Sequence, residues 1–171
     1  MITAHPVRVV ILMGVSGAGK TSIGQLLATS LNWTFFDGDD FHPKTNVEKM
    51  RRGVALTDED RDAWLTALER LIRDLTAGGR PAVIACSALK QTYRDRLIGN
   101  RNDVVLVYLK GSYNLTRQRL LGREDHFMKA DLLASQFDTL EEPEGVLSVD
   151  ASQAPDAIVR EITQHLGLSP T

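Results

Sequence analysis

The sequence has little of what marks secreted, membrane-spanning or disulfide-stabilised proteins. Its 171 residues include one cysteine, Cys86, so no disulfide can form within the chain, as is usual in a reducing compartment. The longest apolar runs, such as Val104–Leu109, are far shorter than the roughly 20 residues of a membrane span. The opening residues, MITAHPVRVV, lack the regions of a secretory signal. We therefore expect a cytoplasmic protein with no membrane partner.

An excess of charge of one sign is also missing. The chain has 20 Lys and Arg against 22 Asp and Glu, a formal net charge of −2. Such a balance creates no general attraction for nucleic acid, and no surface pattern of aromatic and basic residues is evident. An anionic ligand must therefore be held by a local cluster. The length fits one domain over residues 1–171, without repeats or linkers.

Short apolar runs alternate with helical patterns, which indicates an α/β fold. The runs are apolar throughout rather than at every second residue, as expected for strands buried on both faces. We expect a three-layer fold with a mostly parallel five-stranded sheet between helices. The expected strands are Val7–Met13, Thr34–Asp37, Ala82–Cys86, Val104–Leu109 and Val146–Val149.

The spacing of apolar residues predicts the helices. The clearest stripe runs from Trp64 to Leu75, with Thr57 as the N-cap of its helix. Two stretches break the regular alternation, one over about residues 40–78 and one over about residues 122–136. Ligands of such sheets bind outside the carboxyl ends of the strands, so we expect a substrate-side insertion and a mobile lid. Other helices are expected after the first strand, to Leu31, and over Lys90–Ile98, Asn114–Leu121, Ala130–Phe137 and Asp156–Leu166.

A glycine-rich loop follows the first expected strand. GVSGAGKT satisfies G-x-x-x-x-G-K-[ST], the pattern of a phosphate-binding loop that opens a helix. Its backbone N–H groups can cradle phosphate oxygens, while Lys20 reaches the β- and γ-phosphates and the Thr21 hydroxyl binds Mg²⁺. Ser22 fits a helix-start residue better than a ligand, and the alternative for the whole motif is a glycine-rich turn. The expected ATP-binding residues are Gly14, Val15, Ser16, Gly17, Ala18, Gly19, Lys20, Thr21 and Ser22.

Two acids follow the second expected strand. Asp37 and Asp39 are two residues apart, so in an extended segment they point the same way. Such a pair suits two tasks, holding Mg²⁺ through water and accepting a proton from a hydroxyl. No acid directly follows the third strand, which leaves Asp37 for the metal, although Ser87 there could face a substrate. The alternative is a solvated acidic turn in which Asp39 or Asp40 caps the next helix.

Basic residues occur at two further places. Arg119 and Arg123 are four residues apart at the entry to the expected lid, where they could neutralise charge on a transferring phosphoryl group. The alternative is a solvated helix face. Lys90, Tyr93 and Arg94 follow the third strand, where a substrate carboxylate or phosphate could bind. No Cys/His cluster suggests a structural metal.

These stretches together resemble the gluconate kinases, small P-loop kinases related in layout to shikimate and nucleoside monophosphate kinases. DGD-x-x-HP and CSALK-x-x-YRD are more specific than the phosphate loop, and the likeness covers most of the chain from Leu12 to about Pro143. The matching stretches are MGVSGAGKT, DGDDFHP, NVEKM, DEDRDAWL, CSALKQTYRDRL, VYLKG and RLLGREDHFMKADLLASQFDTLEEP.

The resemblance implies a homodimeric enzyme that transfers a phosphoryl group from ATP, with Mg²⁺, to the 6-hydroxyl of D-gluconate. It implies catalytic roles for Lys20, Arg123 and Asp39, with Asp39 as the base that orients the hydroxyl. Asp37 would support the metal, and Arg119 and Arg123 would contact the nucleotide. The substrate contacts so implied, with Ser87 added, are Asp39, His42, Lys49, Ser87, Arg94 and Gln136.

Three other functions share parts of this pattern. A shikimate kinase would have a Gly-Gly-Gly stretch after the third strand, where this chain has CSALK. A nucleotide kinase would need basic groups for its acceptor where this chain has the acids of DGD-x-x-HP. A P-loop switch would have no need for Asp39 and would offer an N-K-x-D guanine reader, which is absent from the sequence.

Overall fold

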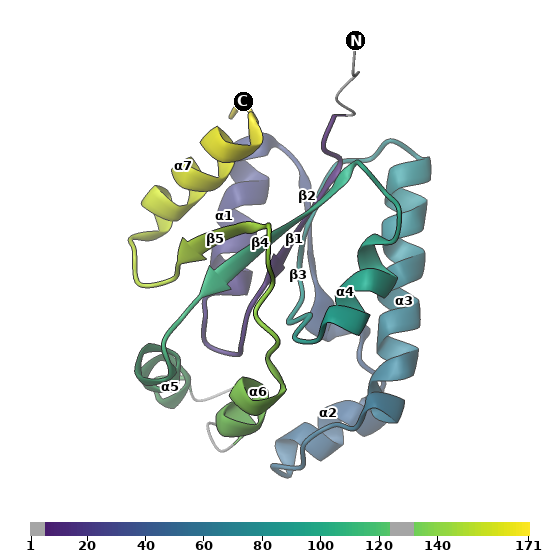
Figure 1. The fold of residues 1–171 in the computed structure, drawn as a ribbon, viewed down its shortest axis with the longest axis vertical. Coiled ribbons are helices and arrows are strands. Elements are labelled where there is room, and N and C mark those ends of the chain that lie inside the picture. Colours follow the sequence, from purple (N-terminus) through teal and green to yellow (C-terminus); the bar gives the residue numbers. More distant parts are fainter. Residues whose placement is uncertain (1–5, 124–131) are drawn as a thin grey trace.

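The computed structural model describes residues 6–123 and 132–171 (Figure 1). Its strands form one sheet in the order β2-β3-β1-β4-β5, and every described pairing is parallel, which confirms the expected α/β fold. A parallel sheet places the carboxyl ends of its strands along one edge, where loops can assemble a site. The strands are β1 Val9–Met13, β2 Thr34–Asp37, β3 Ala82–Ala85, β4 Val104–Lys110 and β5 Leu147–Asp150.

Helices cover both faces of the sheet. Figure 1 shows α1 and α7 on one face, α3 and α4 on the other, and α2, α5 and α6 beyond the carboxyl ends of the strands. The three-layer arrangement is therefore confirmed. The helices are α1 Lys20–Leu31, α2 Lys44–Arg51, α3 Asp58–Ala77, α4 Gln91–Ile98, α5 Tyr113–Leu121, α6 Leu133–Thr139 and α7 Pro155–Leu166, with a short 3₁₀ helix, η1, over Gly38–Phe41.

The central strand β1 shows why these runs are apolar throughout. Val10 and Leu12 pack with the core of α1 and α7, whereas Val9, Ile11 and Met13 pack with the core of α3 and α4. Successive side chains of a strand point to opposite faces, so a strand between two helical layers needs apolar residues at every position. All five residues of β1 are buried.

Element boundaries lie within three residues of the expected ones, and β2 has the expected bounds. The first strand begins at Val9 rather than Val7, and β4 continues to Lys110, whose carbonyl accepts a hydrogen bond from Ala151 N. The predicted cap of α3 is confirmed. Thr57 Oγ1 accepts from Asp60 N at 3.1 Å, and the Asp60 carboxylate accepts from Thr57 N at 2.9 Å, a capping box.

The two stretches that broke the alternation lie at the carboxyl edge. Of the first, over about residues 40–78, α2 and the start of α3 lie at this edge with η1, whereas the rest of α3 covers a face of the sheet. Residues 124–131 of the expected lid lie outside the described residues, and its described residues are 122–123 and 132–136, the last of which lie in α6. None of the helices that the structure describes is long and apolar enough to cross a bilayer.

Candidate active site

Two pockets adjoin at the carboxyl edge of the sheet. The smaller, here called the loop pocket, is lined by Ser16, Gly17, Gly19, Lys20, Thr21, Asp37, Asp39, Ala85 and Arg123. The larger, here called the side pocket, holds about 570 Å³ of empty space, its mouth included. It is lined by Ser16, Lys20, Asp39, His42, Met50, Ala55, Leu56, Arg61, Trp64, Ser87, Leu89, Leu132, Ser135 and Gln136. Three residues, Ser16, Lys20 and Asp39, line both pockets.

The glycines of the loop are required by packing and by backbone conformation. Gly17 has φ +82°, and a Cβ there would lie 2.5 Å from the Thr116 carbonyl oxygen of α5. Gly19 has φ +96° and is the N-cap of α1, without a capping side chain among the described residues. The first N–H groups of α1 therefore remain available to an anion at the loop pocket.

Lys20 lies where the two pockets meet. Its Nζ donates to the carbonyl of Val15 at 3.0 Å, so the side chain folds back across the loop. Burial lowers the pKa of the Lys20 ammonium, and the nearby Asp39 carboxylate opposes this shift. An anion bound in the loop pocket would supply the charge compensation that this ammonium has only in part.

Thr21 and Asp37 form a pair at the floor of the loop pocket. Thr21 Oγ1 donates to Asp37 Oδ2 at 2.8 Å. A hydroxyl beside a carboxylate fits Mg²⁺, which takes oxygen ligands and keeps several waters and phosphate oxygens around it. In the described part of the chain no group of three or more His, Cys, Asp or Glu could hold a metal.

The sequence suggested an extended segment after β2, but the chain forms the short helix η1 there. Asp37 Oδ1 accepts from Asp39 N at 3.0 Å, so Asp37 caps η1 and the chain turns immediately. Gly38 permits this turn because a Cβ there would lie 2.5 Å from the Ala85 carbonyl oxygen, and Trp64 Nε1 donates to the Gly38 carbonyl at 2.7 Å. The extended conformation expected for this segment is therefore wrong, yet both acids line the loop pocket, as expected of a pair that shares one site.

His42 is a neutral group in the wall of the side pocket. Its ring stacks on Trp64 at 4.4 Å between centroids, and burial, with the nearby Arg61 charge, lowers the pKa of His42 to about 4. Asn46 Nδ2 lies 3.4 Å from Nδ1 and can only donate, which places the ring proton on Nε2. Nε2 lies 4.0 Å from Asp39 Oδ1. The ring can therefore donate a hydrogen bond into the site without carrying charge.

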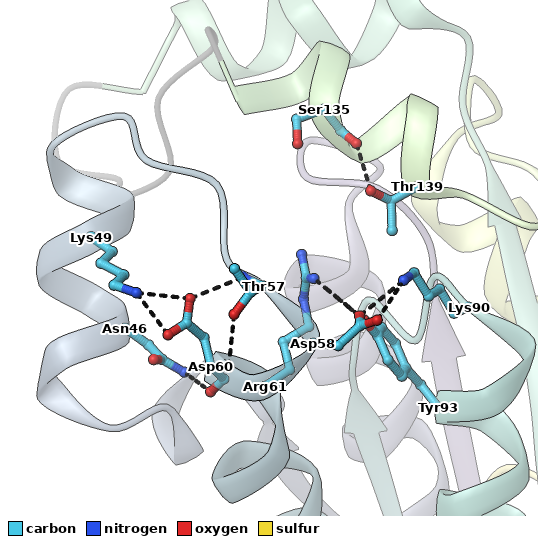
Figure 2. Close-up of polar contacts among 10 residues, drawn as sticks. All are labelled: Asn46, Lys49, Thr57, Asp58, Asp60, Arg61, Lys90, Tyr93, Ser135 and Thr139. Carbon is cyan, nitrogen blue, oxygen red and sulfur yellow. Dashed lines mark hydrogen bonds and ion pairs between the residues drawn. The ribbon is translucent and has the colours of Figure 1, made fainter.

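Arg61 is a site residue that the sequence analysis did not find. It lines the side pocket with a side chain only 16% exposed, and its Nη1 donates to Tyr93 Oη at 3.3 Å (Figure 2). A signal was present, because Arg61 precedes Trp64 by three residues and so shares the inward face of α3. Apart from Lys20, Arg61 is the one cation among the described residues of this pocket.

Other predicted substrate contacts divide into two groups. His42, Ser87 and Gln136 line the side pocket with Asp39. Gln136 also contacts the loop, since its Oε1 accepts from Ser16 N at 2.6 Å. The structure therefore brings these four together in the side pocket, and Asp39 also lines the loop pocket.

Lys49 and Arg94 line neither pocket. Lys49 Nζ donates to both carboxylate oxygens of Asp60, at 2.7 and 2.9 Å, and this lowers the pKa of Asp60 to about 2. Arg94 is buried, and its Nη1 donates to the carbonyls of Ala88 and Leu89 at 2.9 and 3.0 Å. Both cations hold the walls of the site in this structure.

The predicted nucleotide-binding residues also separate. Arg123 lines the loop pocket. Arg119 donates to the carbonyls of Ala18 at 3.2 Å and Ala151 at 2.8 Å, and thus ties the loop to the end of β5. Ser22 is exposed on α1, in keeping with a helix-start residue.

Comparisons with known proteins agree with this geometry. The family model described as shikimate kinase matches residues 16–166. The gluconokinase of Gluconobacter oxydans is 44% identical over 161 residues, which cover 92% of this chain and 90% of that protein. Solved shikimate kinases, at 17 and 18% identity, show the shared P-loop kinase fold alone.

Two solved structures are closer. A sugar kinase from Janibacter sp. HTCC2649 has a TM-score of 0.89 at 39% identity, covering 96% of this chain and 97% of that one. A gluconokinase from Sinorhizobium meliloti 1021 has a TM-score of 0.82 at 40% identity, covering 95% and 92%. Identities of 40 to 44% over more than nine-tenths of the chain, together with the phosphate loop beside a second pocket, show that the protein belongs to the gluconokinase family.

Proposed function

We propose that this chain transfers the γ-phosphoryl group of ATP to the 6-hydroxyl of D-gluconate and forms 6-phospho-D-gluconate. The observation that carries the proposal is the overlap of the two pockets at Ser16, Lys20 and Asp39. A nucleoside triphosphate in the loop pocket and an acceptor in the side pocket would meet at these residues. Direct transfer requires such a meeting point, because the attacking and leaving oxygens must lie roughly in line.

The loop pocket would hold the triphosphate. The N–H groups of the first turn of α1 are available to it, and Lys20 and Arg123 supply positive charge. Thr21 and Asp37 would hold Mg²⁺, Thr21 directly and Asp37 through water. When bound, Mg²⁺ would neutralise charge on the phosphate oxygens.

Asp39 would orient the acceptor hydroxyl and accept its proton. Its side chain is 40% exposed and lies in both pockets, so it can reach a hydroxyl aimed at the γ-phosphate. Neutral His42 beside it can donate a hydrogen bond to the acceptor without competing for the proton, because the pKa of His42 is about 4.

The rest of the side pocket fits an acid that carries several hydroxyl groups. Arg61 would bind the carboxylate of gluconate, since its guanidinium presents a planar pair of donors. Ser87, Ser135 and Gln136 offer hydrogen-bonding groups for the hydroxyls, and Trp64 an apolar wall for the carbon chain. The gluconokinases among the relatives support this choice of acceptor.

A coupled assay of ADP release tests the function. Purified protein with Mg²⁺ and ATP would be offered D-gluconate, shikimate, nucleoside monophosphates, glucose and no acceptor. Strong turnover on gluconate alone, with ³¹P NMR showing a phosphate ester at C6, is the expected result. Turnover on shikimate, the acceptor named by the matching family model, would keep the kinase and reject the substrate. ADP release on none of them would reject catalysis.

We further propose a cytoplasmic homodimer that binds neither nucleic acid nor membranes. The proposal comes from the family likeness and from the balanced charge of the chain. Light scattering on a size-exclusion column measures the mass directly, and a single species of the monomer mass would reject the dimer.

A further inference from the structure

We propose that Tyr93 and Asp58 are positioning residues that aim the Arg61 guanidinium into the side pocket and so give the enzyme its preference for an acceptor with a carboxylate. The inference rests on the proposed function, because it assigns the anionic end of the acceptor to Arg61. It concerns a network outside the two pockets, since neither Tyr93 nor Asp58 lines them.

The network joins the first turn of α3 to the start of α4. Figure 2 shows Asp58, Arg61, Lys90 and Tyr93 converging at one place. Lys90 Nζ donates to both carboxylate oxygens of Asp58, at 2.9 and 3.0 Å. Tyr93 Oη donates to Asp58 Oδ1, and Arg61 Nη1 donates to Tyr93 Oη at 3.3 Å. The hydroxyl therefore links the carboxylate to the guanidinium.

The direction of these hydrogen bonds fixes the orientation of Arg61. A tyrosine hydroxyl has one proton, and here that proton goes to Asp58, so the oxygen presents its lone pairs to Arg61 Nη1. The hydroxyl cannot move away, because Tyr93 is buried in the core between α3 and α4. Its ring lies 5.7 Å from both the Arg61 Cζ and the Lys90 Nζ, and attracts both cations.

Arg61 keeps most of its binding capacity in this arrangement. Asp58 is already engaged by Lys90, and its carboxylate lies 3.9 Å from Arg61 Nη1, a longer contact than that with Lys90. Over residues 6–123 and 132–171, both polar contacts of the Arg61 guanidinium use Nη1. Its other donors face a pocket that also contains Ser135, toward which the side chain extends in Figure 2. An anion with two oxygens can therefore bind there without displacing the network.

Tyr93→Phe tests the proposal, because it removes the hydroxyl and keeps the buried ring. The KM for D-gluconate should rise roughly tenfold, the loss expected for one hydrogen bond to a charged group. The kcat and the KM for ATP should stay within about twofold, and the preference for gluconate over neutral gluconamide should fall. An unchanged gluconate KM would overturn the proposal.

A double-mutant cycle with Arg61→Met separates positioning from packing. If Tyr93 acts through Arg61, Tyr93→Phe should change neither the gluconate KM nor the preference over gluconamide once Arg61 is methionine. An equal effect in both backgrounds would show that Tyr93 acts independently and would overturn the proposal. Where turnover of Arg61→Met is too slow, calorimetric binding of gluconate supplies the same comparison.

The chain offers a matched control on the same two helices. Asp62 of α3 pairs with Arg96 of α4 at 2.8 Å, just as Asp58 pairs with Lys90, but within the described residues neither Asp62 nor Arg96 forms a hydrogen bond or ion pair with Arg61. Asp58→Asn should raise the gluconate KM, whereas Asp62→Asn should leave it unchanged. Equal effects would show that helix docking alone is responsible and would overturn the proposal. If the wild-type enzyme did not phosphorylate gluconate at all, that result would reject the proposed function before this proposal is tested.

Discussion

The amide oxygen of Gln136 accepts a hydrogen bond from the backbone N–H of Ser16 at 2.6 Å, and this contact joins α6 to the phosphate loop at the boundary of the two pockets. The two residues are 120 positions apart in the chain. In the proposed reaction a group placed there would border both the nucleotide and the acceptor, so its charge would matter as much as its hydrogen bond.

Gln136→Glu should therefore impair turnover more than Gln136→Leu does. Leucine removes the acceptor for Ser16 N, whereas glutamate keeps an acceptor oxygen but adds negative charge beside the transferring phosphoryl group. We expect kcat to fall by about tenfold for leucine and at least about 100-fold for glutamate. Steady-state kinetics with both variants checks this order. A glutamate variant as active as the leucine variant would show that the phosphoryl group passes elsewhere.

Lys20→Met should abolish turnover without lowering the stability of the ligand-free protein. Burial lowers the pKa of Lys20, which means that the buried positive charge reduces the free energy of unfolding. An uncharged methionine removes this destabilising effect. We expect kcat to fall by at least about 1,000-fold, with an unchanged or higher Tm. Thermal melts with and without ATP provide the measurement. A marked fall in Tm without ligand would contradict this description of the lysine.

Asp39→Asn should lower kcat by at least about 100-fold and leave ATP binding in place. The amide keeps the size of the carboxylate but cannot accept the proton of the acceptor hydroxyl. Asp40 provides a neighbouring control, because it lines neither pocket and Asp40→Asn should be nearly as active as the wild type. Near-normal kcat for Asp39→Asn would remove Asp39 as the base.

His42 should make the protein less stable in mild acid. The pKa of His42 is about 4 in the folded protein and about 6.5 in an unfolded chain, so below pH 6.5 the unfolded state binds a proton that the folded state does not. Stability is then full above about pH 6.5 and falls by roughly 3 kcal/mol as the pH drops to about 4.

Urea unfolding at pH 7.5, 6 and 5 measures this dependence, with His42→Asn as the reference that cannot titrate. The difference in unfolding free energy between wild type and variant should shrink steadily toward pH 5. The carboxylate of Asp60 contributes separately, because its pKa of about 2 places its effect below pH 3.8. A constant difference across the series would contradict the buried, neutral histidine.

The fold and the phosphate loop were predictable because their signals are local. The residues of Val9–Met13 are all apolar, which is enough to predict a strand buried on both faces. The eight residues GVSGAGKT contain the glycines, the lysine and the hydroxyl that define a phosphate loop. The place of Asp39 beside the loop was predictable for the same reason, although its backbone conformation was not. The capping hydrogen bond from Asp39 N to Asp37 competes with extension, and the sequence gives no measure of that competition.

The roles of the cations were harder to predict because their partners are distant in the sequence. Arg94 and Lys49 looked like substrate contacts, yet in the structure they pair with carbonyls and a carboxylate that only the folded chain brings near. Arg61 was missed because its inward direction depends on Tyr93, 32 residues further along the chain. An isolated basic residue does not reveal whether its partner is the protein or a ligand.

Asp60 gives the acceptor side of the site an unusual mechanical property. It closes the capping box of α3 with Thr57, pairs with Lys49 of α2, and offers its carbonyl to Asn46 Nδ2 at 2.7 Å. Detaching the wall formed by α2 therefore means breaking an ion pair and a hydrogen bond to the first turn of a 20-residue helix packed on the sheet. We expect the amide hydrogens of this half of the site to exchange with solvent at the same slow rate as those of the core, because both open as one cooperative unit. The proposed acceptor, gluconate, would then bind a surface that is preorganised before it arrives.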